Sequence, residues 1–82
     1  MSEYLEQERS RGQKAREILD NPIWKEAVSQ INQSLLEKMG RHYDNPQACQ
    51  VIALTKMIHD DYQAYFESIA ESGKLAAYEL NQ

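Results

Sequence analysis

Apolar side chains recur at steps of three and four residues along three stretches of the chain, the spacing that places them on one face of an α-helix. The first stretch presents Tyr4, Leu5, Gly12, Ala15, Ile18 and Leu19. The second presents Trp24, Ala27, Val28, Ile31, Leu35 and Met39. The third presents Val51, Leu54, Ile58, Tyr62, Tyr65, Ile69, Ala76 and Leu80. The pattern predicts an all-α protein built from three amphipathic helices.

Helix-start chemistry occurs twice, because the tripeptide Asp-Asn-Pro stands at 20–22 and again at 44–46. Asparagine caps helix N-termini well, and proline suits the first helical position, where a backbone N–H would have no partner. Gly40 falls where a C-cap is expected. We therefore predict a single helical domain over 1–82, with helices over approximately 3–20, 22–39 and 46–81.

The lengths of these helices suggest their arrangement. The third helix has about 35 residues and spans on the order of 50 Å. The short loop returns the second helix along its first half. The first helix then either continues along the second half, giving a long hairpin with one arm broken at Asn21-Pro22, or folds back into a compact three-helix bundle. Matching arm lengths favour the hairpin, and the residues expected in its core include Trp24, Ile58, Tyr62 and Tyr65.

Chain length limits how stable such a hairpin can be. The chain has 82 residues and one cysteine, Cys49, so no internal disulfide supplements the core. A domain of this size buries only about 60–65% of the surface that its unfolded chain exposes. Small domains commonly rely on a disulfide, a metal or a second subunit. We therefore expect another chain to support this one.

A second, thinner set of apolar positions points to where that support comes from. Ala53, Met57, Ala64, Leu75 and Tyr78 lie roughly opposite the main face of the third helix, and Leu36 points away from the main face of the second. Isolated surface apolar residues are normal. A helix contacted on two sides, as in a homo-oligomer, explains the set better. The predicted protein interface consists of Leu36, Met57, Ala64, Leu75 and Tyr78.

Charge gives a second hypothesis. The net charge is −4, and the excess lies after Lys56, where five acidic residues face one lysine. An acidic surface disfavours binding to phosphate backbones. It also allows the chain to imitate phosphate charge and to inhibit a basic host protein. The acidic face for that alternative consists of Asp60, Asp61, Glu67 and Glu71.

A basic cluster near the N-terminus gives a third hypothesis, nucleic-acid binding. Its members are Arg9, Arg11, Lys14 and Arg16. On a helical wheel Arg9 and Arg16 flank one edge of the apolar face, whereas Arg11 and Lys14 flank the other. Side chains divided in this way suit ion pairs and stem packing better than one groove-reading surface. The pattern therefore favours a structural or partner-pairing role.

Residues that could carry catalysis do not converge. His59, Asp60 and Asp61 are consecutive, so on a helix they point in different directions. His42 falls in the loop, and Cys49 in a first helical turn has no sequence pattern that supplies a base. We therefore expect neither an enzyme nor a metal or cofactor site. The absence of an apolar window of 18 residues predicts a cytoplasmic protein without a membrane partner.

Two segments resemble a known group of proteins. One reads Arg11-x-x-Lys14-Ala15-x-x-Ile18-Leu19-Asp20-Asn21-Pro22-x-Trp24-x-Glu26-Ala27, and the other reads Ile69-x-x-x-Gly73-Lys74-Leu75-Ala76. Together they are similar to the start and the end of short helical proteins encoded by tailed phages, often near head and DNA-packaging genes. The resemblance implies a phage-encoded virion or assembly protein in the host cytoplasm or the virion, and it implies no catalytic residue. The loop at 41–44 has no counterpart in that pattern.

The leading hypothesis combines these observations. We expect a non-enzymatic phage protein that forms a homo-oligomer through its helices and serves as a minor virion or assembly protein. Its further partner would be a phage structural protein or a host protein.

Overall fold

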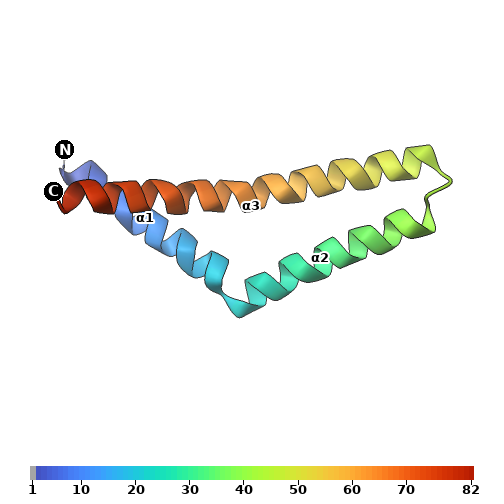
Figure 1. Cartoon of the computed structure of the whole chain (residues 1–82), viewed down its shortest axis with the longest axis horizontal. Coiled ribbons are helices and arrows are strands. Elements are labelled where there is room, and N and C mark those ends of the chain that lie inside the picture. Colours follow the sequence, from blue (N-terminus) through green and yellow to red (C-terminus); the bar gives the residue numbers. More distant parts are fainter. Residues whose placement is uncertain (1) are drawn as a thin grey trace.

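The computed structural model describes residues 2–82, and these residues form three helices and no strand (Figure 1). Helix α1 runs over Ser2–Asp20, α2 over Pro22–Arg41 and α3 over Pro46–Leu80. The all-α prediction with a long third helix is confirmed. Each predicted boundary lies within two residues of the observed one.

Both asparagine caps form as their tripeptides predict. Asn21 Oδ1 accepts hydrogen bonds from the backbone N–H of Ile23 at 2.8 Å and of Trp24 at 3.3 Å. Asn45 Oδ1 accepts one from Ala48 at 3.1 Å. Each bond satisfies a backbone donor that the first helical turn would otherwise leave without a partner.

The end of α2 differs from the prediction. Gly40 is not a left-handed C-cap, because no glycine among the described residues has a positive φ. The helix instead continues through Arg41. The backbone N–H of His42 closes it by donating to the carbonyls of Lys38 at 3.1 Å and Met39 at 3.3 Å.

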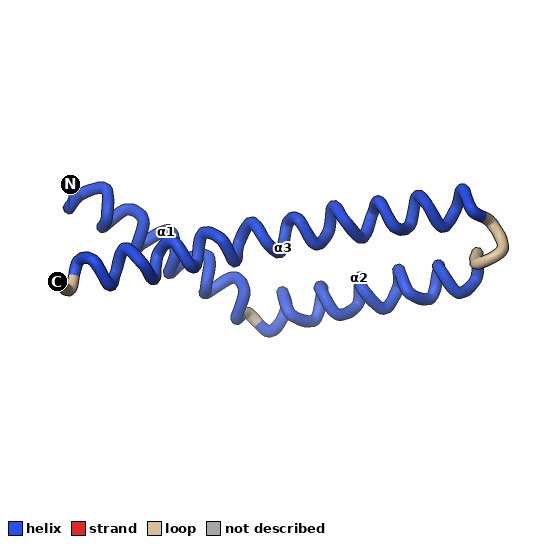
Figure 2. The backbone as a smooth tube through the Cα atoms, turned by 45° about the horizontal axis from the view of Figure 1, so that its top comes forward, coloured by secondary structure: helices blue, strands red, loops and turns tan. Residues whose placement is uncertain are grey.

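The three helices form an elongated hairpin with one broken arm. Helix α1 packs across the C-terminal half of α3, α2 runs back from the loop beside the N-terminal half, and the two chain ends lie at the same end (Figures 1 and 2). The molecule measures 57 × 23 × 14 Å, and its radius of gyration is 17.5 Å. A compact domain of this length would have a radius of gyration of about 12 Å. The hairpin is therefore the arrangement adopted, rather than the compact bundle.

Two glycines meet where α1 crosses α3. A Cβ atom built on Gly73 would lie 2.5 Å from Gly12 Cα and 3.2 Å from the Glu8 carbonyl oxygen. A Cβ atom on Gly12 would overlap Gly73 Cα and lie 3.0 Å from the Ile69 carbonyl oxygen. The two backbones are in direct contact, and only glycine at both positions permits this approach.

The buried hydrophobic residues are Ala15, Leu19, Leu35, Ala70 and Ala76. Leu35 lies between α2 and α3, away from the crossing. Ala15, Leu19 and Ala70 form the core cluster beside the crossing. Trp24, Phe66 and Ile69 are partly buried against it. The rings of Trp24 and Phe66 meet edge to face, with centroids 5.2 Å apart. Trp24 Nε1–H donates to Gln63 Oε1 at 3.2 Å, which gives the indole a polar partner at the core margin.

Three residues expected in the core lie outside it. Ile58, Tyr62 and Tyr65 are 59%, 65% and 61% exposed. The apolar face of α3 is covered by α1 only in its second half, where Ile69 is partly buried and Ala76 is buried. Because α3 is one continuous helix, its close crossing with α1 fixes the rotation of the whole helix, and the first half of the same face points to solvent.

Candidate self-association surfaces

More large apolar side chains are exposed than buried in the part of the chain that the structure describes. Five hydrophobic residues are buried, and three of them are alanines. Fourteen large hydrophobic residues are exposed: Tyr4, Ile18, Ile23, Ile31, Leu36, Tyr43, Val51, Leu54, Met57, Ile58, Tyr62, Tyr65, Leu75 and Tyr78. Surface apolar residues are common on monomers when they are isolated, but contiguous sets mark contact surfaces.

The most regular set runs along the first half of α3. We call it the outer stripe, and it consists of Val51, Leu54, Ile58, Tyr62 and Tyr65. Its five members are between 51% and 65% exposed. Ile58, Tyr62 and Tyr65 line a shallow depression of about 260 Å³ together with Asp61. Tyr65 also lies edge to face against Phe66 at a centroid distance of 6.3 Å, which connects the stripe to the core.

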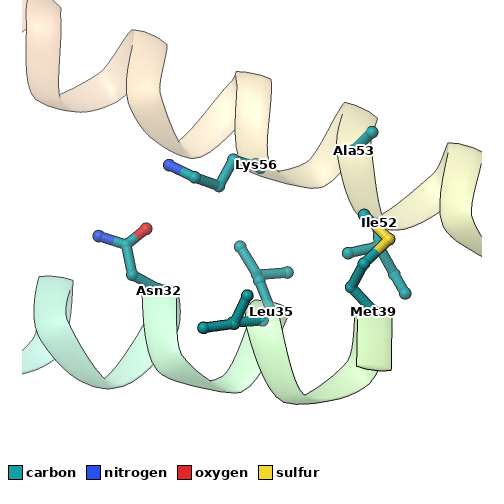
Figure 3. Close-up of a pocket in the computed structure, with 7 residues that line it drawn as sticks. Asn32, Leu35, Met39, Ile52, Ala53 and Lys56 are labelled. Atoms are coloured by element: carbon teal, nitrogen blue, oxygen red, sulfur yellow. The ribbon is translucent and has the colours of Figure 1, made fainter. Parts of the chain in front are cut away.

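A second apolar surface is the groove between α2 and α3. It has a volume of about 490 Å³ and is lined by Asn32, Leu35, Leu36, Met39, Ile52, Ala53 and Lys56. Leu35, Met39 and Ile52 project into it from the two helices, whereas Asn32 and Lys56 lie at one end (Figure 3). Lys56 Nζ is held there by Asp60 of its own helix, at 2.9 Å from Oδ1. The groove is apolar along most of its length and polar at one end.

The five predicted interface residues are all exposed, but they do not form one patch. Leu36 lines the α2–α3 groove. Met57, Ala64, Leu75 and Tyr78 are distributed along α3, with about 30 Å between the first and the last. Leu75 lies beyond the crossing, in a depression of about 220 Å³ that α1 helps to line. These residues therefore offer several separate contacts.

The outer stripe was missed as an interface because its residues were expected in the core. The positions of the polar residues on the α2-facing side of the same helix could have indicated that the stripe faces away from α2. His59 and Gln63 are half-buried there, while Ile58 and Tyr62 beside them are exposed. His59 Nε2 and Asn32 Oδ1 are buried without a hydrogen-bond partner. On this half of α3 the polar residues His59 and Gln63 thus share the inner side with Ile52 and Phe66, while five large apolar side chains point outward, which is unfavourable for an isolated hairpin.

The acidic residues of α3 are partly compensated by their neighbours. Asp60 pairs with Lys56, and Glu71 lies 3.6 Å from Lys74 Nζ. Glu67 Oε1 accepts a hydrogen bond from Gln63 Nε2 at 3.4 Å. The four predicted acidic positions, Asp61 included, therefore do not form one uncompensated face.

The basic residues of α1 divide as the helical wheel predicts. Arg9 and Arg16 lie on one side of the helix crossing, in a depression that also contains Lys74. Arg9 pairs with Glu6 at 2.7 Å, and Arg11 lies 3.8 Å from Glu8. Both ion pairs lie within α1 and at least one partner of each is exposed, so they contribute little stability. The structure brings Arg9 and Arg16 to one depression and does not add Arg11 or Lys14 to it.

The residues considered for chemistry have structural contacts. Cys49 Sγ–H donates to the backbone carbonyl of His42 at 3.1 Å, so the two residues stabilise the loop next to the start of α3. Within residues 2–82 no three His, Cys, Asp or Glu side chains group closely enough to hold a metal ion.

Over residues 2–82, no helix is both long enough and apolar enough to cross a bilayer. Comparisons with protein-family models, curated proteins and solved structures gave no match.

Proposed function

We propose that this protein is a non-enzymatic, phage-encoded subunit that self-associates through apolar surfaces on α2 and α3 and serves as a minor virion or assembly protein. One observation carries the proposal: the hairpin exposes fourteen large hydrophobic side chains and buries only two, Leu19 and Leu35, beside three alanines. In a monomer with this distribution most of the large apolar side chains stay in contact with water and do not stabilise the fold by burial.

The energetic reason is direct. Removing one large apolar side chain from water stabilises a protein by about 2 kcal/mol. The small residues of the crossing bring two backbones together but bury little apolar area, since Ala15, Ala70 and Ala76 each contribute one methyl group. A second chain that covers the outer stripe would add more apolar burial than any rearrangement of the crossing.

Surfaces on two sides of α3 suit an assembly role. The outer stripe lies on one side, and the α2–α3 groove, which Leu36 helps to line, lies toward another. A subunit can pair with its own copy through one surface and remain available to a phage structural protein through the other. In that arrangement the predicted interface residues outside the outer stripe would contact the phage structural protein.

The phage assignment is supported by the residues that carry the resemblance. They coincide with the architectural positions of the fold: Ala15 and Leu19 are buried, Trp24 follows the broken joint, and Gly73 forms the crossing. A family built on this hairpin would need these residue types at these spacings. The resemblance thus supports a shared architecture with the short helical proteins of tailed phages.

The assembly role is tested by mass spectrometry of purified virions and of assembly intermediates from the phage that encodes the chain. We expect the protein at a defined copy number in one of the two. Its absence from both, with abundant expression during infection, would contradict the assembly role and favour a host-directed one.

A further inference from the structure

We infer that the outer stripe is covered by the outer stripe of a second copy of this chain, running antiparallel, with Ile58 of both copies at the two-fold axis. This inference rests on the self-association proposed above and specifies its partner, orientation and register.

The spacing of the stripe is the first argument. From Val51 to Tyr65 the steps are three, four, four and three residues, which read the same in both directions. An antiparallel pair centred on Ile58 therefore places Val51 opposite Tyr65 of the second copy, and Leu54 opposite Tyr62. Every member of the stripe meets another member, as an isologous two-fold contact requires.

Side-chain size is the second argument. In the antiparallel pair each tyrosine meets a smaller aliphatic residue, so the layer between the two helices keeps nearly the same thickness from end to end. In a parallel pair, tyrosines would meet tyrosines at 62 and 65 while Val51 met Val51. The helices would then be forced apart at one end and underpacked at the other.

Helix geometry is the third argument. Val51 and Tyr62 are separated by 11 residues, as are Leu54 and Tyr65. An 11-residue repeat corresponds to about 3.67 residues per turn, close to the 3.6 of a straight helix. The stripe therefore runs almost along the axis of α3, for about 20 Å, and two straight helices can contact along its whole length.

The available area and the position of α1 agree with this partner. Five half-exposed apolar side chains offer on the order of 500 Å² per copy, which gives about the 1,000 Å² expected of a specific interface. In this register the first residue of the second copy's α3, Pro46, lies opposite Ala70, which α1 already buries. The second copy's α3 thus begins at the edge of the region that α1 covers.

The charges near the stripe are also compatible. Its five members are uncharged, and Asp61 is the one charged residue that lines the depression. In the antiparallel register the two copies of Asp61 are offset by about 9 Å along the helix axis. At physiological salt that offset is close to one Debye length, so their repulsion is largely screened.

Disulfide cross-linking tests the register. The variants Ile58→Cys, Val51→Cys, Tyr65→Cys and Leu36→Cys are made in a Cys49→Ala background, and circular dichroism confirms that each is helical. We expect Ile58→Cys to cross-link with itself under mild oxidation. Val51→Cys alone stays unlinked, because two copies of residue 51 lie about 20 Å apart, but it links when mixed with Tyr65→Cys. Leu36→Cys, in the α2–α3 groove outside the stripe, reports on that alternative surface, and we expect it to stay unlinked.

Four outcomes would overturn the inference in distinguishable ways. Self-linking of Val51→Cys as readily as Ile58→Cys would indicate a parallel pair. A preferential cross-link through Leu36→Cys would place the interface at the α2–α3 groove. If no variant cross-links although light scattering shows an oligomer, the interface lies at some other surface. In both cases the proposed self-association stands. A monomer by light scattering in the Cys49→Ala background and in the native chain would remove both this inference and the proposed self-association.

Discussion

Gly12 of α1 and Gly73 of α3 meet backbone to backbone, with a Cβ on Gly73 placed 2.5 Å from Gly12 Cα. This contact positions the broken arm of the hairpin against the long helix. It also fixes the rotation of α3, and with it the direction in which the outer stripe points. The contact between Gly12 and Gly73 therefore determines both how the core is arranged and why the outer stripe is exposed.

Gly73→Ala should destabilise the protein, although alanine is the better helix former. The added Cβ overlaps the α1 backbone, and relieving that overlap costs about 1–3 kcal/mol, more than the roughly 1 kcal/mol that alanine gains by helix propensity. We expect a lower urea midpoint and a lower melting temperature.

Gly40→Ala is the matched control for that substitution. Gly40 is also helical, but a Cβ there would meet nothing within 4 Å. We expect Gly40→Ala to stabilise the protein by about 0.5–1 kcal/mol. Equal stabilisation by the two substitutions would show that α1 and α3 do not approach closely.

Trp24→Phe should modestly weaken the packing of α2 against α3. The phenyl ring can keep the edge-to-face contact with Phe66, but it loses the hydrogen bond from Nε1–H to Gln63. We expect a loss of about 1 kcal/mol in the free energy of unfolding for Trp24→Phe, and about 3 kcal/mol or more for Trp24→Ala. Ile23→Ala, at an exposed neighbouring position, should change it by less than about 0.5 kcal/mol. Urea unfolding followed by far-ultraviolet circular dichroism measures all three.

Asn32→Leu should stabilise the protein. Asn32 Oδ1 is buried at the end of the α2–α3 groove without a hydrogen-bond partner. Replacing the side chain by an apolar one of similar size removes that penalty and fills the groove, for a gain of about 1 kcal/mol. Gln33→Leu, one residue further on an exposed position, is the control and should leave the urea midpoint unchanged. A decrease for Asn32→Leu would indicate that Oδ1 has a partner in solution.

Much of the fold could be predicted because its determinants are local. The two Asp-Asn-Pro tripeptides specify where α2 and α3 begin, and the lengths of the three periodic stretches lead to a hairpin. The end of α2 was predicted less well, since Gly40 was assigned a left-handed cap that the chain does not use. These features depend on a few neighbouring residues each.

The rotation of α3 could not be predicted in the same way, because it depends on a contact between residues far apart in sequence. A helical wheel shows that Ile58, Tyr62, Ile69 and Ala76 share one face, but not that α1 covers only the last two. The small residues at 12 and 15 and at 70, 73 and 76 were the available signal for a close crossing.

Ile58→Glu should disrupt self-association while leaving the fold intact. The substituted residue lies at the centre of the outer stripe and is exposed in the single chain, so the hairpin tolerates the charge. In the antiparallel pair two carboxylates would meet in a desolvated contact, which we expect to weaken association at least 100-fold. Ser68→Glu, an exposed position on the same helix, adds the same charge and should leave association unchanged. Sedimentation velocity distinguishes the two.

The most direct measurement is the mass of the native chain in solution. Light scattering after size exclusion, at tens of micromolar protein and moderate salt, should give at least twice the chain mass of 9.5 kDa. The mass should fall toward that of one chain on dilution, while the helical circular dichroism signal weakens, because the oligomer supports the small core. A constant mass of 9.5 kDa at every concentration, with full helicity, would contradict self-association as the role of the exposed apolar surfaces.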